Sequence, residues 1–187
     1  LAKSLRKESG SKNLCLSGGV ALNCVANGKL ISEKIFENIW VQPASGDAGS
    51  SLGASLLGYY DYLKNKRAIN GNDSMKGTYL GPSFSNDEII KFLSTTEAKY
   101  QSLEDNKLLP LLANLLNDGK VIGWFNGKLE FGPRALGGRS IIGDPRNKEM
   151  QSIMNLKIKF RESFRPFAPS ILKEDISTQF ELNQESP

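Results

Sequence analysis

The chain has 187 residues, of which 39% are hydrophobic and 24% are charged. This composition suits a folded protein of one ordinary domain or two small ones, and it excludes a disordered chain. The net charge of +4 is compatible with an anionic small molecule or a nucleic acid, whereas the absence of histidine excludes Ser-His and Cys-His nucleophile pairs within these residues.

The first part of the chain repeats a strand, a turn and a helix. Residues 1–8 have helical spacing and end at Ser9-Gly10, a pair that is typical of a helix C-terminus. Two apolar runs that suit short strands follow, each with a glycine-containing turn and a helical run behind it. The predicted strands are residues 13–17 and 38–43, and the predicted helices are residues 21–33 and 52–66. Two such units predict an α/β domain.

Residues 64–77 lose this periodicity and gain Gly, Asn and Lys, which predicts a linker and a domain boundary near residue 70. Beyond it, Ser85 or Asn86 can cap a helix that carries Glu88 in its first turn. Two more helices are predicted at residues 106–119 and 147–160, and an extended segment at residues 165–172. This part of the chain therefore reads as α+β.

A hairpin is predicted at Asn126-Gly127, because this pair lies between two apolar runs. Trp124, Phe125 and Phe131 are expected to form its core. Nucleic-acid binding would need exposed aromatic side chains on which bases stack, so no nucleic-acid partner is expected.

Positive charge is concentrated in one part of the sequence. Residues 120–165 hold ten Lys and Arg residues against four Asp and Glu residues. Such a block is often only a solvated face, but four of its arginines lie beside Pro, Gly and Phe, which predicts a constrained backbone and partial burial. These are Arg134, Arg139, Arg161 and Arg165. We expect them to need an anionic partner.

The densest part of this block is FGPRALGGRSI, residues 131–141, which fits neither an amphipathic helix nor an alternating strand. Converging guanidinium groups bind phosphate or carboxylate in a bidentate manner, and the glycines would let backbone amides approach the same anion. The alternative pairs the arginines with carboxylates of the same domain. Those carboxylates are Glu130, Asp144 and Glu162.

Two turns of the first part could also bind ligands. Gly18-Gly19 before a helix leaves amides free for a phosphate, although many tight turns contain two glycines. Asp47 could cap the helix that begins near Ser50 or coordinate a metal, and spacing alone favours the cap.

Four segments together resemble the O-carbamoyltransferases, the family of nodulation protein U and of the enzymes that carbamoylate cephamycin and tobramycin. They are NLCLSGGVALNCVANGKL, PASGDAGSSLGAS, GWFNGKLEFGPRALGGRSIIGDPR and KFRESFRPFAPSIL. The likeness runs from about Ser11 to Leu172, and FGPRALGGRSI is its most specific element. Gly143 departs slightly, since the family more often has alanine there.

The resemblance implies an α/β fold in two parts. Residues 1–70 would be the C-terminal part of an actin and sugar-kinase-like (ASKHA) domain, and residues 71–187 an incomplete YrdC-like α+β domain. The chain starts at Leu1 inside a helix and stops after a polar run, so we expect a fragment of a longer protein that is inactive in transfer by itself.

The same resemblance implies an ATP-dependent O-carbamoyltransferase. Carbamoyl phosphate and ATP would form carbamoyl adenylate and pyrophosphate in the YrdC-like part, and the carbamoyl group would then pass to the hydroxyl of a small-molecule acceptor. A divalent metal, iron or magnesium, would assist the transfer.

Matched by motif, ten residues would form these sites. The adenylate-forming pocket would take Arg134, Arg139, Ser140, Lys159, Arg161 and Arg165. Gly18, Gly19 and Asn23 would lie against ATP, and Asp47 would bind the metal, whose histidine ligands lie outside this chain.

Two other functions stay open: a nucleotide-binding module without chemistry, and an actin-like ATPase or kinase that needs no carbamoyl phosphate. The two cysteines are too few for a disulfide framework, and no signal-like or long apolar segment is present. A cytoplasmic protein without a membrane partner is therefore expected, with a homodimer as one possible assembly.

Overall fold

The computed structural model describes residues 1–69 and 71–182 and divides into two compact units. The first unit holds Leu1–Pro82 together with Lys128–Ala135, and the second holds Ser83–Gly127 and the described residues from Leu136 onward. Residue 70 of the predicted linker and residues 183–187 of the predicted second domain lie outside the described residues. The assignment of an actin-like part up to residue 70 and a YrdC-like part after it stays a prediction.

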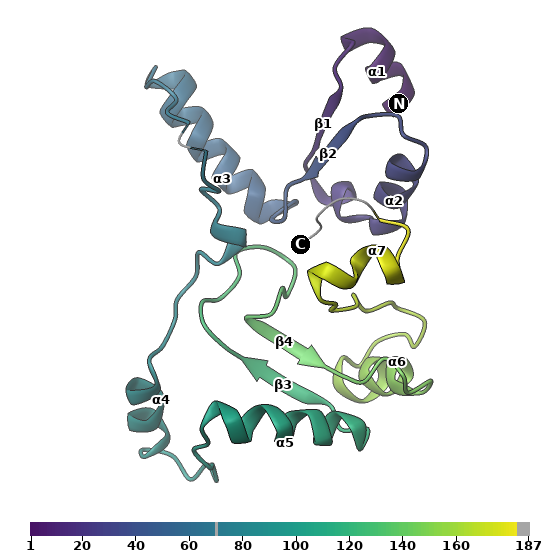
Figure 1. Ribbon diagram of the computed structural model, residues 1–187. Coiled ribbons are helices and arrows are strands. Elements are labelled where there is room, and N and C mark those ends of the chain that lie inside the picture. Colours follow the sequence, from purple (N-terminus) through teal and green to yellow (C-terminus); the bar gives the residue numbers. More distant parts are fainter. Residues whose placement is uncertain (70, 183–187) are drawn as a thin grey trace. The chain divides into compact units, whose positions relative to one another are not determined.

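The first unit begins with a helix and a parallel pair of strands. Helix α1 (Ala2–Ser9) ends at Gly10, whose positive φ of 65° lets its amide donate to the Arg6 carbonyl oxygen. Strands β1 (Asn13–Leu16) and β2 (Asn38–Val41) lie side by side (Figure 1). Their parallel register places Asn13 opposite Asn38. Both strands lie within the stretches predicted from the sequence.

Two further α-helices belong to this unit. A 3₁₀ turn (Gly19–Leu22) and helix α2 (Cys24–Ser32) follow β1, and helix α3 (Asp47–Leu57) follows β2. Helix α3 continues into a π-helical turn, Gly58–Tyr62. Among the described residues of this unit, the buried apolar side chains are Leu14, Ala21, Phe36 and Ala44.

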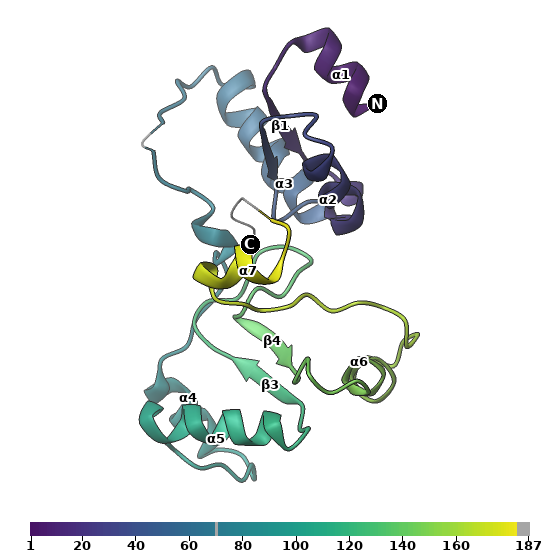
Figure 2. The same ribbon diagram turned by 45° about the vertical axis from the view of Figure 1, so that its right-hand side comes forward.

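The second unit holds two helices before its strands. Helix α4 (Asn86–Leu93) begins after Ser85, and helix α5 (Asp105–Asn117) carries Pro110 in its second turn. Strand β3 (Ile122–Phe125) pairs in antiparallel fashion with β4 (Arg139–Ile142) (Figure 2). Their register places Phe125 opposite Arg139.

Helix α6 (Met150–Ile153) continues into a π-helical turn, Met154–Ile158, which agrees with the helix predicted there. A 3₁₀ turn (Lys173–Asp175) and helix α7 (Ile176–Gln179) follow the non-helical segment at residues 165–172. None of the described helices is both long and apolar enough to cross a lipid bilayer.

The hairpin predicted at Asn126-Gly127 is wrong. The strand that pairs with β3 is β4, and the segment directly after Gly127 bonds to the first unit's residues 78–82 instead. Phe125, which was expected in a hairpin core, is 58% exposed, whereas Trp124 and Phe131 are half-buried. A local turn signal cannot report which distant strand competes for the same backbone groups.

Candidate functional site

The arginine-bearing segment Lys128–Ala135 is attached to the first unit by its backbone. The Leu129 carbonyl oxygen accepts from the Gly81 amide at 2.9 Å, and the Leu129 amide donates to the Pro82 carbonyl oxygen at 3.0 Å. The Phe131 amide donates to the Thr78 carbonyl oxygen at 2.7 Å. Two sequence motifs thereby meet, since Gly132 also lies against Ala44, three residues before Asp47.

Arg134 is exposed at the end of this segment and makes no hydrogen bond or ion pair with any other described residue. Its expected partial burial is therefore wrong. An exposed guanidinium is fully hydrated, so the fold does not oblige it to find an anion, but its five donors are available to one.

Asp47 is the first residue of helix α3, and the cap position belongs to Gly46, which offers no side-chain hydrogen bond. The interpretation of Asp47 as a cap of a helix beginning near Ser50 is therefore wrong. Its exposed carboxylate lies at the positive end of the helix dipole, a favourable place for a negative charge.

A metal site needs more ligands than Asp47 supplies. Among the described residues, no three carboxylates, thiols or imidazoles gather where they could hold an ion. Iron or magnesium would take several such ligands. The residues present therefore do not fit a complete metal site.

The turn at Gly18-Gly19 precedes helix α2, and Gly18 is half-buried whereas Gly19 is exposed. Gly18 has a φ of 90°, and the 3₁₀ turn of Gly19–Leu22 lies between it and the helix. Asn23 caps α2, because its Oδ1 accepts from the Ala26 amide at 3.1 Å. The side chain of Asn23 thus already has a structural role in the helix that a nucleotide would approach.

Arg139, the first residue of β4, is half-buried and bends back onto its own loop. Its Nη1 donates to the carbonyl oxygens of Gly138 at 2.8 Å and Asn126 at 3.1 Å, and its Nη2 donates to that of Gly127 at 3.2 Å. The guanidinium carbon lies 3.4 Å from the centre of the Phe125 ring. These contacts fasten the two ends of the loop between β3 and β4.

Ser140, the next residue of β4, accepts a hydrogen bond at its Oγ from the Gly137 amide at 3.1 Å. This bond holds a glycine whose φ is 105°. Arg139 and Ser140 therefore both stabilise the turn at Gly137-Gly138, which we call the glycine-rich turn, and they fix its conformation before any ligand binds.

The remaining cations lie on what we call the basic loop, residues 159–165, which follows the π-helical turn after α6. Arg161 is half-buried; its Nε donates to Asn155 Oδ1 at 2.6 Å, and its guanidinium carbon lies 4.9 Å from the centre of the Phe167 ring. Lys159 is exposed at the start of the loop. The predicted partial burial is confirmed for Arg139 and Arg161.

Arg165 is exposed, against expectation, and forms an ion pair with Glu162, at 2.7 Å between Nε and Oε2. This hydrogen bond holds the pKa of the Glu162 carboxyl below its ordinary value. Asp144 is likewise engaged by Arg146, 2.7 Å away. The alternative of pairing with nearby carboxylates thus describes Arg165 correctly and does not describe Arg161, whose partner is an amide.

The sequence interpretation missed Asn155, which is 0% exposed and contacts the basic loop at several points. A signal existed, because Asn155 follows the buried Met154 in a stretch with helical spacing, where an apolar residue would be ordinary. Its partners, however, lie on a loop whose course the sequence does not predict.

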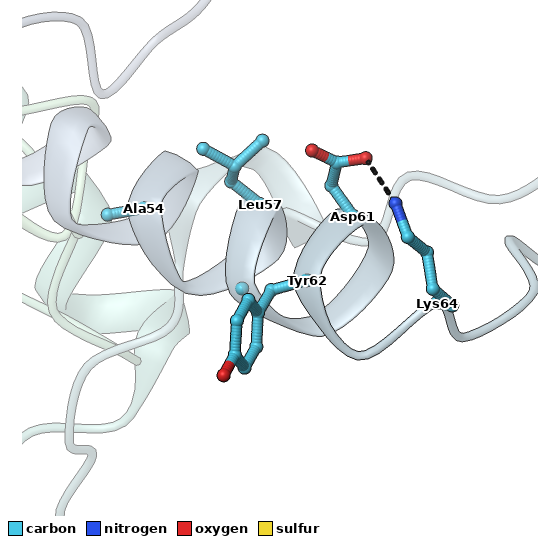
Figure 3. Close-up of a pocket in the computed structure, with 6 residues that line it drawn as sticks. Ala54, Leu57, Asp61, Tyr62 and Lys64 are labelled. Carbon is cyan, nitrogen blue, oxygen red and sulfur yellow. Dashed lines mark hydrogen bonds and ion pairs between the residues drawn. The ribbon is translucent and has the colours of Figure 1, made fainter.

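A shallow surface depression lies elsewhere, on helix α3 and the π-helical turn behind it, and contains none of the predicted site residues (Figure 3). It is lined by Ala54, Leu57, Gly58, Asp61, Tyr62 and Lys64. Since α3, the π-helical turn and Lys64 just after it supply all of these residues, the depression has no opposing wall to enclose a ligand.

Comparison with known proteins agrees with the motifs. Residues 1–56 match the family model of the carbamoyltransferase N-terminus, and residues 113–187 match that of the carbamoyltransferase C-terminus. These two matches together cover more than half of the chain and respect its order.

Three relatives illustrate the likeness. An uncharacterized protein of Synechocystis sp. is 57% identical over 100% of this chain and 31% of its own length. Nodulation protein NolO of Bradyrhizobium diazoefficiens is 42% identical over 95% of this chain and 32% of its own length. Nodulation protein U of Azorhizobium caulinodans is 36% identical over 91% and 28%. The chain spans about a third of the length of these relatives. It belongs to the carbamoyltransferase family.

Proposed function

We propose that the protein carries out carbamoyl transfer from carbamoyl phosphate to the hydroxyl of a small-molecule acceptor, through a carbamoyl adenylate made with ATP. The observation that carries the proposal is the family match at both ends of the chain, joined to a half-buried arginine on the basic loop. The activity belongs to the whole protein, of which these residues are one part.

We assign the adenylate-forming step to the YrdC-like part, residues 71–187, which contains the basic loop. Carbamoyl phosphate is first split by water into carbamate and phosphate. A carbamate oxygen then attacks the α-phosphorus of ATP, the bond from that phosphorus to the bridging oxygen breaks, and pyrophosphate leaves. Fixed cations stabilise the charge that develops on the phosphate oxygens.

The candidate cations contribute differently to that pocket. Arg161 is the best placed, because its guanidinium is already oriented by Asn155 and Phe167 and still presents its two terminal nitrogens. Arg139 and Ser140 shape the glycine-rich turn, whose amides can approach an anion. Arg134, Lys159 and Arg165 are exposed, and their assignment to the pocket rests on the family resemblance.

The remaining assignments concern ATP and the transfer site. Gly18 and Gly19 would offer backbone amides to the nucleotide beside Asn23. Asp47 would provide one ligand to a divalent metal, iron or magnesium, with the other ligands outside this chain. A cytoplasmic location and a homodimer complete the proposal.

The experiment uses the full-length protein and measures pyrophosphate. We expect release only when both carbamoyl phosphate and ATP are present. A nucleotide-binding module would release none, and an ATPase or kinase would consume ATP without carbamoyl phosphate; either result would overturn the proposal.

Substitutions test which arginines take part in the formation of the adenylate. Arg161→Ala and Arg139→Ala should each lower the rate of pyrophosphate release about tenfold or more, which is the loss expected for a hydrogen bond to a charged group. Arg146→Ala is the matched control, because Arg146 is engaged by Asp144 and is not assigned to the pocket. Equal effects of all three substitutions would remove the pocket from the proposal.

A further inference from the structure

Asn155 is bonded to the basic loop by every polar atom of its side chain. Its Nδ2 donates to the carbonyl oxygens of Ser163 at 3.0 Å and Arg165 at 2.8 Å. Its Oδ1 accepts from Arg161 Nε at 2.6 Å, and its backbone oxygen accepts from the Arg161 amide at 3.0 Å. One buried residue of the π-helical turn thus contacts three residues of the loop.

This arrangement orients the Arg161 guanidinium. Because Nε faces Asn155, the group cannot rotate about its long axis without breaking a buried hydrogen bond. The Phe167 ring bounds the guanidinium through a cation-π contact. The terminal nitrogens Nη1 and Nη2, which form no hydrogen bond with other described residues, are left to meet an anion in bidentate fashion.

We propose that Asn155 is a positioning residue that holds Arg161 and the basic loop in place for a phosphate group. The inference rests on the proposed function, in which this loop binds the phosphates of ATP or the pyrophosphate product. Asn155 itself touches no substrate and acts through Arg161. An amide suits this position because it offers two donors and an acceptor and carries no charge. A carboxylate in its place would neutralise the arginine.

The first experiment measures the position of Arg161 directly, without any substrate. In the full-length protein, the Arg161 Nε proton should exchange slowly with water in ¹⁵N-resolved NMR spectra, and Asn155→Ala should accelerate that exchange about tenfold or more, as the loss of a buried hydrogen bond to a charged group implies. Unchanged exchange would overturn the positioning role, whatever the enzyme's activity.

The second experiment measures the dissociation constant of inorganic pyrophosphate by calorimetry. Asn155→Ala should raise it about tenfold, whereas Asn117→Ala should leave it within about twofold. Asn117 is the matched control, because its Oδ1 also accepts from an arginine, Arg146 at 3.0 Å, away from the basic loop.

A double-mutant cycle of Asn155 and Arg161 distinguishes a positioning role from a general loss of structure. If Asn155 acts through Arg161, Asn155→Ala should have little further effect on pyrophosphate binding once Arg161→Ala is present. Fully additive effects would overturn the proposal. Asn155→Ser, which keeps a donor in the buried position, is the second variant should Asn155→Ala fail to fold, and it should weaken binding less than a tenfold change.

The two experiments also distinguish the inference from the proposed function. A wild-type protein that shows slow Nε exchange but binds no pyrophosphate would overturn the assigned phosphate site and, with it, the functional part of the inference. A protein that binds pyrophosphate with the same affinity in wild type and Asn155→Ala would leave the proposed function standing and overturn the role of Asn155.

Discussion

Gly132 occupies a place in the first unit where no other residue fits well. Its φ of 133° lies in a region that residues with a side chain rarely adopt. A Cβ atom built on Gly132 would lie 3.0 Å from the Cα of Ala44, which is backbone and cannot move aside. The close approach joins the FGPR motif to the PASGD motif, so the glycine is required by packing as well as by conformation.

Gly132→Ala should therefore lower the free energy of unfolding by about 2 kcal/mol, the combined result of a strained backbone and a displaced neighbour. Denaturant unfolding monitored by circular dichroism measures the change. Gly28→Ala is the matched control, because a Cβ at Gly28 in helix α2 meets no atom within 4 Å. That control should raise stability by up to about 1 kcal/mol. Equal midpoints for Gly132→Ala and wild type would contradict the close approach.

Single residues also show how much of the candidate site the sequence could predict. The flanking Pro, Gly and Phe residues led to an expectation of burial that holds for Arg139 and Arg161 and fails for Arg134 and Arg165. The residues next to an arginine in the sequence indicate how constrained its backbone is. Its burial depends on which distant segments of the chain pack against it. Arg161 is oriented by the buried side-chain amide of Asn155. The spacing of residues in the sequence does not predict the hydrogen-bond partners of that amide.

At the scale of elements, helix α4 illustrates a prediction that local chemistry settles. Ser85 Oγ accepts from the Glu88 amide at 3.3 Å, and Glu88 Oε2 accepts in return from the Ser85 amide at 2.7 Å. Both partners of this capping box lie within four residues, so the sequence contains all that is needed. The Ser85 amide, and then the Ser85 hydroxyl, hold the pKa of the Glu88 carboxyl below its ordinary value.

The sign of this shift predicts how α4 depends on pH. A carboxyl whose pKa is lowered by folding stabilises the protein above its unfolded pKa, about 4.3, and loses that contribution as the pH falls through the folded value. The stability difference between wild type and Glu88→Gln should therefore favour wild type at pH 6 and shrink as the pH falls below about 4. Unfolding curves recorded across that range measure it.

Glu97→Gln serves as the comparison, since Glu97 caps no helix and shows what the loss of any one carboxylate does to the curves. A Glu88→Gln difference that stayed constant down to pH 3 would argue against the capping box. Because both groups are exposed, the effect is expected to be small and is best read from its pH dependence.

The strands illustrate the opposite case. The helices and the parallel pair β1 and β2 follow from periodicity and turn residues near each element. The partner of β3 does not, because the predicted hairpin and the observed pairing with β4 compete for the same backbone groups. The segment after Gly127 bonds to residues 78–82, which are distant in sequence, so the competition was decided by packing within the first unit.

At the scale of the whole molecule, the chain passes from the second compact unit back into the first for one short segment and then returns to the second. Lys128–Ala135 belongs to the first unit, although both flanking stretches belong to the second. Three backbone hydrogen bonds, between residues 78–82 and residues 129–131, account for this membership. Cooperative units of a fold open separately, and amide exchange reports the unit to which a segment belongs.

Hydrogen exchange measured by mass spectrometry should therefore group residues 78–82 with residues 128–132, apart from β3 and β4. In Gly132→Ala, exchange should accelerate in both of these segments together, because the substitution weakens the contact with Ala44 that holds them. The amides of Ile122–Phe125 and Arg139–Ile142 should exchange as in wild type, since their ladder lies in the second unit. Acceleration in β3 and β4 together with residues 128–132 would assign this segment to the second unit and contradict the division. Exchange that rose only at residue 132 would show that the close approach to Ala44 does not hold the segment.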